Sequence, residues 1–147
     1  MPSDDFPAGW ADRGRRLARS IAHVGSAQVE ETRLTDHLIL FTLLPPNPRA
    51  AEICLIVSPY EVILTAGRGT RFDLDALPAS AEEVTALAFA IAGGGLTERV
   101  RGNRVVDFTL RLDDGTHRRE GWRWGFPWRF PWMDEAKIEY PPYRDNG

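Results

Sequence analysis

The turn Ala66–Arg71, with the sequence AGRGTR, has the residue types that best suit the binding of a small anion. Its glycines can expose backbone N–H groups, and Arg68, Thr70 and Arg71 add guanidinium and hydroxyl donors. No lysine-hydroxyl pair and no helix start follow it, as they would in a phosphate-binding loop. Two interpretations stay open: an anion site, or a glycine-rich turn that only joins two strands.

Residues that perform catalysis in other proteins are sparse. The single cysteine, Cys54, lies in an apolar run with no histidine near it in sequence, which indicates a core residue. Asp113 and Asp114 stand before a glycine, where a tight turn favours them. The three histidines do not share metal-ligand spacing with other ligating residues: His23, His37 and His117. The sequence therefore predicts no catalytic residue, no metal site and no cofactor.

The segment Gly121–Met133, GWRWGFPWRFPWM, carries large aromatic side chains on successive even positions: Trp122, Trp124, Phe126, Trp128, Phe130 and Trp132. Rings of ~150–250 Å² each add up to more than the ~300–600 Å² apolar patch that a monomer usually exposes. Pro127 and Pro131 lack the N–H that a central strand needs. We expect the first two tryptophans to finish the last strand and the chain beyond Phe126 to leave the sheet as an arm.

Two interpretations of this arm stay open, and a third has less support. The arm could dock on its own domain, for instance onto Trp10 of the first helix. It could instead contact a second copy or another protein, with Trp and Arg as anchors; the expected contact residues are Arg123, Trp128, Arg129, Phe130 and Trp132. Stacking on a sugar or a nucleobase is the third interpretation.

A basic strip is predicted on the strands that precede the arm. Arg99 and Arg101 share one face of a strand, the Gly102–Asn103 turn brings Arg104 close, and Arg111 follows. Such a strip could meet an acidic protein or RNA. The ordinary alternative is that the solvent face of a one-sided sheet is polar and that arginine is the default cation of this chain.

Composition narrows the class of protein. The chain has 147 residues, which suits one domain, and its formal net charge of -3 argues against nucleic acid as the main partner. Lys137 is the only lysine, as coding bias in a high-GC bacterial genome would produce. No apolar segment has signal-peptide or membrane-spanning length, so the sequence predicts a cytoplasmic protein without a membrane partner.

The first half of the chain predicts one helix and a run of short strands. Residues 10–24 form an amphipathic helix with a basic outer face. Strands are then expected at the following residues: 29–34, 37–44, 52–58, 61–65 and, briefly, 70–74. The short links between them imply antiparallel hairpins and hence a meander.

The second half predicts a further helix and three strands. Ser80 with Glu83 forms a capping box, and Gly93–Gly95 ends the helix. The strands are expected over residues 96–101 and 104–112 and from Thr116 into the aromatic segment.

This order predicts an α+β fold: a single twisted antiparallel sheet, a meander of short strands, with two helices on one face and a Trp- and Pro-rich C-terminal arm. Residues 1–133 form one domain, and residues 134–147 are expected to be a loosely attached tail.

The leading hypothesis for function is a non-enzymatic cytoplasmic protein-interaction domain, of the kind found in immunity-type inhibitors and assembly accessories, with a protein or a second copy of itself as partner. The alternative is a protein or enzyme that binds a small anion in a cavity between sheet and helices near Gly67–Arg71.

Overall fold

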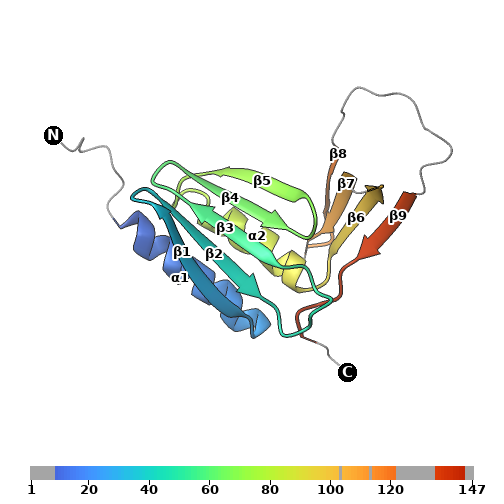
Figure 1. The fold of residues 1–147 in the computed structure, drawn as a ribbon, viewed down its shortest axis with the longest axis horizontal. Coiled ribbons are helices and arrows are strands. Elements are labelled where there is room, and N and C mark those ends of the chain that lie inside the picture. The colour runs from blue at the N-terminus through green and yellow to red at the C-terminus, as the bar shows by residue number, and fades with distance from the viewer. Residues whose placement is uncertain (1–8, 103, 113, 122–134, 145–147) are drawn as a thin grey trace.

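The computed structural model describes residues 9–102, 104–112, 114–121 and 135–144, which form two helices and nine strands (Figure 1). The predicted α+β class is confirmed. The helices are α1 (Trp10–Gly25) and α2 (Ala81–Ala92). Among these residues, neither helix combines the length and the apolar character that crossing a membrane requires.

A five-stranded antiparallel meander forms the larger sheet, in the order β1-β2-β3-β4-β5. Its strands closely match the predicted ranges: β1 (Gln28–Thr35), β2 (Leu38–Leu44), β3 (Ile53–Val57), β4 (Glu61–Ala66) and β5 (Thr70–Asp75). Alternate residues of the central strands are buried, because successive side chains of a strand point to opposite faces of the sheet. The register of the hairpins places the buried residues of neighbouring strands side by side on one face. That face forms the core.

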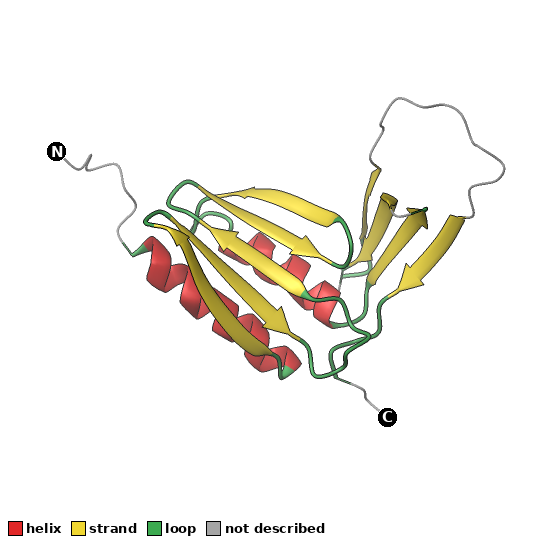
Figure 2. Cartoon of the chain, viewed as in Figure 1, coloured by secondary structure: helices red, strands yellow, loops and turns green. Residues whose placement is uncertain are grey.

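Both helices lie on the same side of this sheet (Figure 2). Helix α1 contacts β1, β2 and β3, and α2 contacts β4. Gly14 permits a close approach, since a Cβ there would lie 3.0 Å from Val57 Cγ1. The serine half of the predicted capping box at the start of α2 does not form. Ser80 occupies the N-cap position, but its side chain makes no capping hydrogen bond, and its buried Oγ has no partner within the described part of the chain.

The prediction of a single sheet is wrong, because the strands after α2 form a sheet of their own. Its order is β8-β7-β6-β9, with β6 (Leu96–Arg101), β7 (Arg104–Arg111), β8 (His117–Gly121) and β9 (Glu135–Glu139). Strands joined by a hairpin usually pair with each other. Helix α2, however, separates β5 from β6, so β6 can start a new sheet. The second sheet packs beside β5 and α2 through side chains. Phe72 and Phe108 meet edge to face, with ring centroids 5.3 Å apart.

Residues Glu135–Arg144 are firmly attached, unlike the loose tail that was expected. Strand β9 pairs with β6 in register from Thr97↔Glu139 to Arg101↔Glu135. Beyond it, Tyr143 is 1% exposed; its hydroxyl donates to Ala51 O at 2.6 Å and its N–H to Ala92 O at 2.8 Å. The two prolines at 141 and 142 suggested a loose end, whereas this tyrosine fixes the segment between both helices.

Candidate functional site

The predicted anion-binding turn holds an anion, and that anion is the carboxylate of Glu98. Glu98 lies on β6 and is 0% exposed. Its Oε1 accepts a hydrogen bond from the N–H of Arg68 at 2.9 Å, and its Oε2 accepts from the N–H groups of Gly69 and Thr70, both at 3.0 Å. The Thr70 hydroxyl adds a donor to Oε2 at 2.7 Å. A buried carboxylate requires such a set of donors.

A fifth hydrogen bond comes from the segment after β9. The Tyr140 hydroxyl donates to Glu98 Oε1 at 2.6 Å. Burial, together with the hydrogen bond to this carboxylate and its negative charge, raises the pKa of Tyr140 well above its usual range. The hydroxyl therefore stays protonated and remains a donor at physiological pH. Glu98 thus ties β6, the β4–β5 turn and the C-terminal segment together.

The backbone of the turn is shaped to fit this carboxylate. Gly67 has φ +62°, a conformation that favours glycine, and a Cβ at this position would lie 2.5 Å from Glu98 Oε1. Gly69 is approached by Val105 of the second sheet, which would lie 3.1 Å from an added Cβ. The two glycines therefore serve the contact between sheets as well as the turn.

The three residues expected to bind an anion play different parts. Arg68 contributes its N–H and Thr70 its N–H and hydroxyl, all to Glu98. The Arg71 guanidinium instead pairs with Asp73, with Nε 3.0 Å from Oδ1, at the exposed surface. Because Glu98 uses the donors of the turn, a phosphate from solution would have to displace a buried carboxylate.

One sequence signal could have revealed Glu98. It alternates with Arg99 and Arg101, so it belongs to the same face of β6 as Leu96 and Val100, and both of these are buried. An acidic side chain that points into the core needs hydrogen-bond donors around it. The glycine-rich turn Ala66–Arg71 was the best group of such donors in the sequence.

The basic strip contains an ion pair with an acidic residue. Arg99 and Arg101 lie on one strand face, and Arg101 pairs in register with Arg104, as predicted. Arg99, however, forms a two-pronged ion pair with Asp107 across the strands, with Nε 2.9 Å from Oδ1. Acidic groups therefore interrupt the strip, which weakens its likeness to a nucleic-acid surface.

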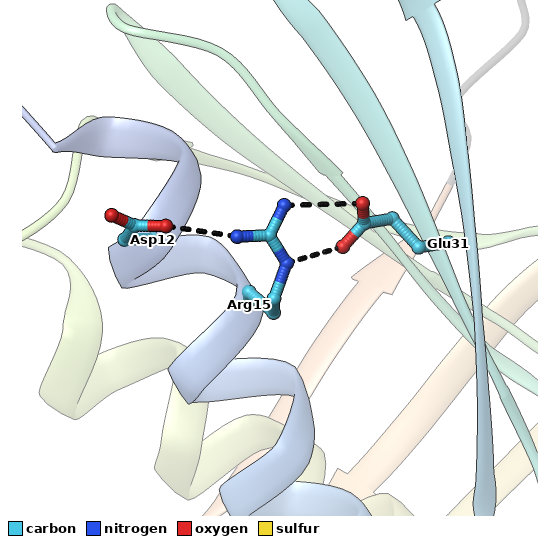
Figure 3. Close-up of polar contacts among 3 residues, drawn as sticks. All are labelled: Asp12, Arg15 and Glu31. Carbon is cyan, nitrogen blue, oxygen red and sulfur yellow. Dashed lines mark hydrogen bonds and ion pairs between the residues drawn. The ribbon is translucent and has the colours of Figure 1, made fainter.

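A charged cluster joins α1 to the edge strand β1 (Figure 3). Arg15 donates to both oxygens of Glu31, at 2.6 and 3.1 Å, and to Asp12 Oδ1 at 2.8 Å. The hydrogen bond from Arg15, and then its charge, hold the pKa of the Glu31 carboxyl below its usual range. This contact gives the solvent-facing side of α1 a structural role.

We expect the substitution Arg15→Gln to raise the pKa of Glu31 toward its ordinary value, as measured by NMR titration of the side-chain carboxyl. A lowered folded-state pKa stabilises the fold above the unfolded pKa, and this contribution is lost as pH falls through the folded value. In Arg15→Gln, the free energy of unfolding should therefore fall less steeply as the pH is lowered. Arg16→Gln, an exposed change on the same helix, is the control. An unchanged Glu31 pKa in Arg15→Gln would refute the contact.

Within the described ranges, the cysteine and the possible metal ligands do not come together into a site. Cys54 is half-buried, and burial raises the pKa of its thiol, which disfavours the reactive thiolate. Described residues include no group of three or more His, Cys, Asp or Glu side chains that could hold a metal ion.

The expected partner-binding residues, Arg123, Trp128, Arg129, Phe130 and Trp132, lie outside the described residues, and so does the rest of 122–134. The strands that flank this segment are described. Strand β8 ends at Gly121, opposite Asp107, and β9 begins at Glu135, opposite Arg101. The chain therefore returns to the sheet after the aromatic residues, so the segment is a connection between the two edge strands rather than a terminal arm.

The chain matches no protein-family model, no curated protein and no solved structure.

Proposed function

We propose that this chain is a non-enzymatic protein-interaction domain of the cytoplasm, with residues 122–134 as the centre of its contact surface. The observation that carries the proposal is the long aromatic connection between two edge strands that are both held in the sheet. Its anchor residues are Arg123, Trp128, Arg129, Phe130 and Trp132.

The length of the connection supports this proposal. Strands β8 and β9 are separated by three inter-strand steps, about 14 Å. The thirteen residues 122–134 can extend to about 45 Å. Connections in compact domains are mostly about four to six residues long, and much longer ones are commonly functional. Closing the sheet therefore does not require this length.

The composition of the connection supports it further. Tryptophan and arginine are the residues most enriched among those that dominate binding energy at protein interfaces. The core of the described residues draws on both helices, both sheets and Tyr143. Trp10, the expected docking point on α1, is already half-buried against that core. We therefore expect a partner protein or a second copy of the chain to cover the aromatic rings of residues 122–134.

The triple substitution Trp128→Ser, Phe130→Ser, Trp132→Ser should abolish partner binding while leaving the fold intact. We expect at least a tenfold loss of affinity, since a single anchor residue contributes ~2 kcal/mol or more. Sedimentation of the purified chain measures self-association. Cross-linking in the source cells with quantitative mass spectrometry identifies any other partner.

The matched control replaces three apolar residues that are exposed in the described structure, Val24, Leu34 and Tyr60, with serine. This control should keep the self-association and the cross-linked partners of the wild type. If the aromatic triple variant unfolds at a much lower temperature and the wild type neither self-associates nor cross-links to a specific protein, the rings belong to the core and the proposal fails.

A further inference from the structure

Strand β1 leaves one edge of the larger sheet open. It is the first strand of that sheet, and in the described part of the chain no strand pairs with its other side (Figure 1). It is eight residues long, and all of them except Val29 are exposed. An edge strand presents a row of unpaired N–H and C=O groups that can pair with another chain. Proline and lysine, which often protect such edges, are absent from β1.

The two faces of β1 carry different residues. The carboxylate of Glu31 binds Arg15 of α1, so Glu31 belongs to the face that the helices cover (Figure 3). Side chains alternate along a strand, so Arg33 shares this face. Thr32 is in register with Leu40 and belongs to the open face of the sheet. Any strand that pairs with β1 must match this alternation.

Symmetry limits how a second copy could pair with this edge. When two identical strands pair antiparallel about a two-fold axis, opposite residues lie on the same face of the joined sheet, and one residue lies opposite its own copy. The longest overlaps have Glu31 or Thr32 at this centre, because the middle of β1 lies between them. A centre at Glu31 places two carboxylates directly opposite each other, which is destabilising. The shorter overlaps centred on Glu30 or Arg33 likewise oppose two groups of the same charge.

The register centred on Thr32 brings complementary residues together. It places each Glu31 opposite Arg33 of the second copy, an opposite-charge pair that occurs twice by symmetry. Thr32 lies opposite its own copy, and such a pair can form a hydrogen bond. A carboxylate has about four lone-pair sites, so Glu31 can keep both bonds from Arg15 and still accept from Arg33. The shift of register between Arg33 and Thr35 lies beyond these central pairs.

We propose that two copies of this chain join antiparallel through β1, centred on Thr32, so that their two five-stranded sheets become one continuous sheet. Both copies keep their helices on the same side, because the two-fold axis is perpendicular to the sheet. This surface is distinct from residues 122–134, so the inference does not rest on the proposed function. Self-association that survives the substitution of Trp128, Phe130 and Trp132 by serine is assigned to β1.

The first test is disulfide cross-linking of the full chain with Cys54→Ser, which removes the natural thiol. Opposite residues of paired strands lie close enough for a disulfide, so mild oxidation should convert Thr32→Cys to a covalent dimer. Glu30→Cys is the matched control, since Glu30 is exposed on the same face of the same strand. In this register the two copies of residue 30 lie about 13 Å apart along the strands, and the control should stay monomeric.

The second test reverses the charges of the Glu31–Arg33 pairs. Arg33→Glu and Glu31→Arg should each weaken dimerisation about tenfold or more, as measured by sedimentation, because each opposes like charges twice. An equimolar mixture of the two variants should restore the dimer, since one chain then carries arginine at both positions and the other carries glutamate at both. Thermal unfolding checks that each variant is folded. A merely destabilised fold would not be rescued by mixing.

The proposal is overturned if Thr32→Cys stays monomeric under oxidation at about 1 mM chain, a concentration at which even weak specific pairs form. It is overturned if Glu30→Cys forms the dimer as fast as Thr32→Cys, or if Arg33→Glu folds normally and associates like the wild type. The cross-link of Thr32→Cys should also form when Trp128, Phe130 and Trp132 are serine. Its loss there would assign the self-association to residues 122–134 and overturn the pairing through β1.

Discussion

Replacing Glu98 with alanine is expected to destabilise the fold by about 3–5 kcal/mol, the largest effect of any polar substitution in the described chain. The change removes a carboxylate that accepts five hydrogen bonds. It leaves three backbone N–H groups without this acceptor; that of Thr70 is buried and those of Arg68 and Gly69 are partly buried. A buried donor left unsatisfied costs about 1–3 kcal/mol. Urea denaturation monitored by circular dichroism measures the free energy of unfolding. Glu61→Ala, an exposed glutamate on β4, should cost less than about 0.5 kcal/mol.

The same variant tests whether the turn is an anion receptor. Sodium formate should raise the thermal midpoint of Glu98→Ala more than the same concentration of sodium chloride, because a small carboxylate can occupy the vacated donors. The wild type should show no such difference. If Glu98→Ala is as stable as Glu61→Ala, the buried hydrogen bonds contribute little and the described link between the two sheets is wrong.

Replacing Tyr143 with alanine is expected to destabilise the fold by about 3–5 kcal/mol, as for other large aromatic side chains in a core. Its ring lies against α1, where a Cβ added to Gly25 would be 2.8 Å from Tyr143 Cδ2. Tyr143→Phe should cost about 1 kcal/mol, since it removes only the hydrogen bond to Ala51 O. Thermal and urea unfolding of both variants measure these differences.

The control is Tyr60→Ala, because Tyr60 is 61% exposed, and it should cost less than about 1 kcal/mol. A Tyr143→Ala variant as stable as this control would mean that residues beyond β9 are loosely attached after all.

The meander and both helices could be predicted because each depends on local patterns. Short runs rich in β-forming residues, at 37–44 and 52–58, identify strands, and the Ser58–Pro59 link predicts a hairpin. The second sheet could not be predicted, since nothing local distinguishes a strand that joins the first sheet from one that begins another. Strand β9 was missed because Glu135–Glu139 has a weak pattern, and its pairing with β6 depends on contacts distant in sequence.

The site was predicted in part. The glycines and donors of Ala66–Arg71 indicated an anion, but the sequence offered no means of finding which anion. Glu98 is 28 residues from Thr70 in the chain, and only folding of the second sheet brings them together.

The central claim, that residues 122–134 serve an external partner, is tested most directly by acrylamide quenching of tryptophan fluorescence. Four of the five tryptophans lie in this segment, and a Trp10→Phe variant removes the fifth. At concentrations where sedimentation shows a monomer, we predict red-shifted emission with a large quenchable fraction, and protection when a partner or a second copy binds. Blue-shifted emission that is almost fully protected in the monomer would contradict the account and assign the rings to the domain's own core.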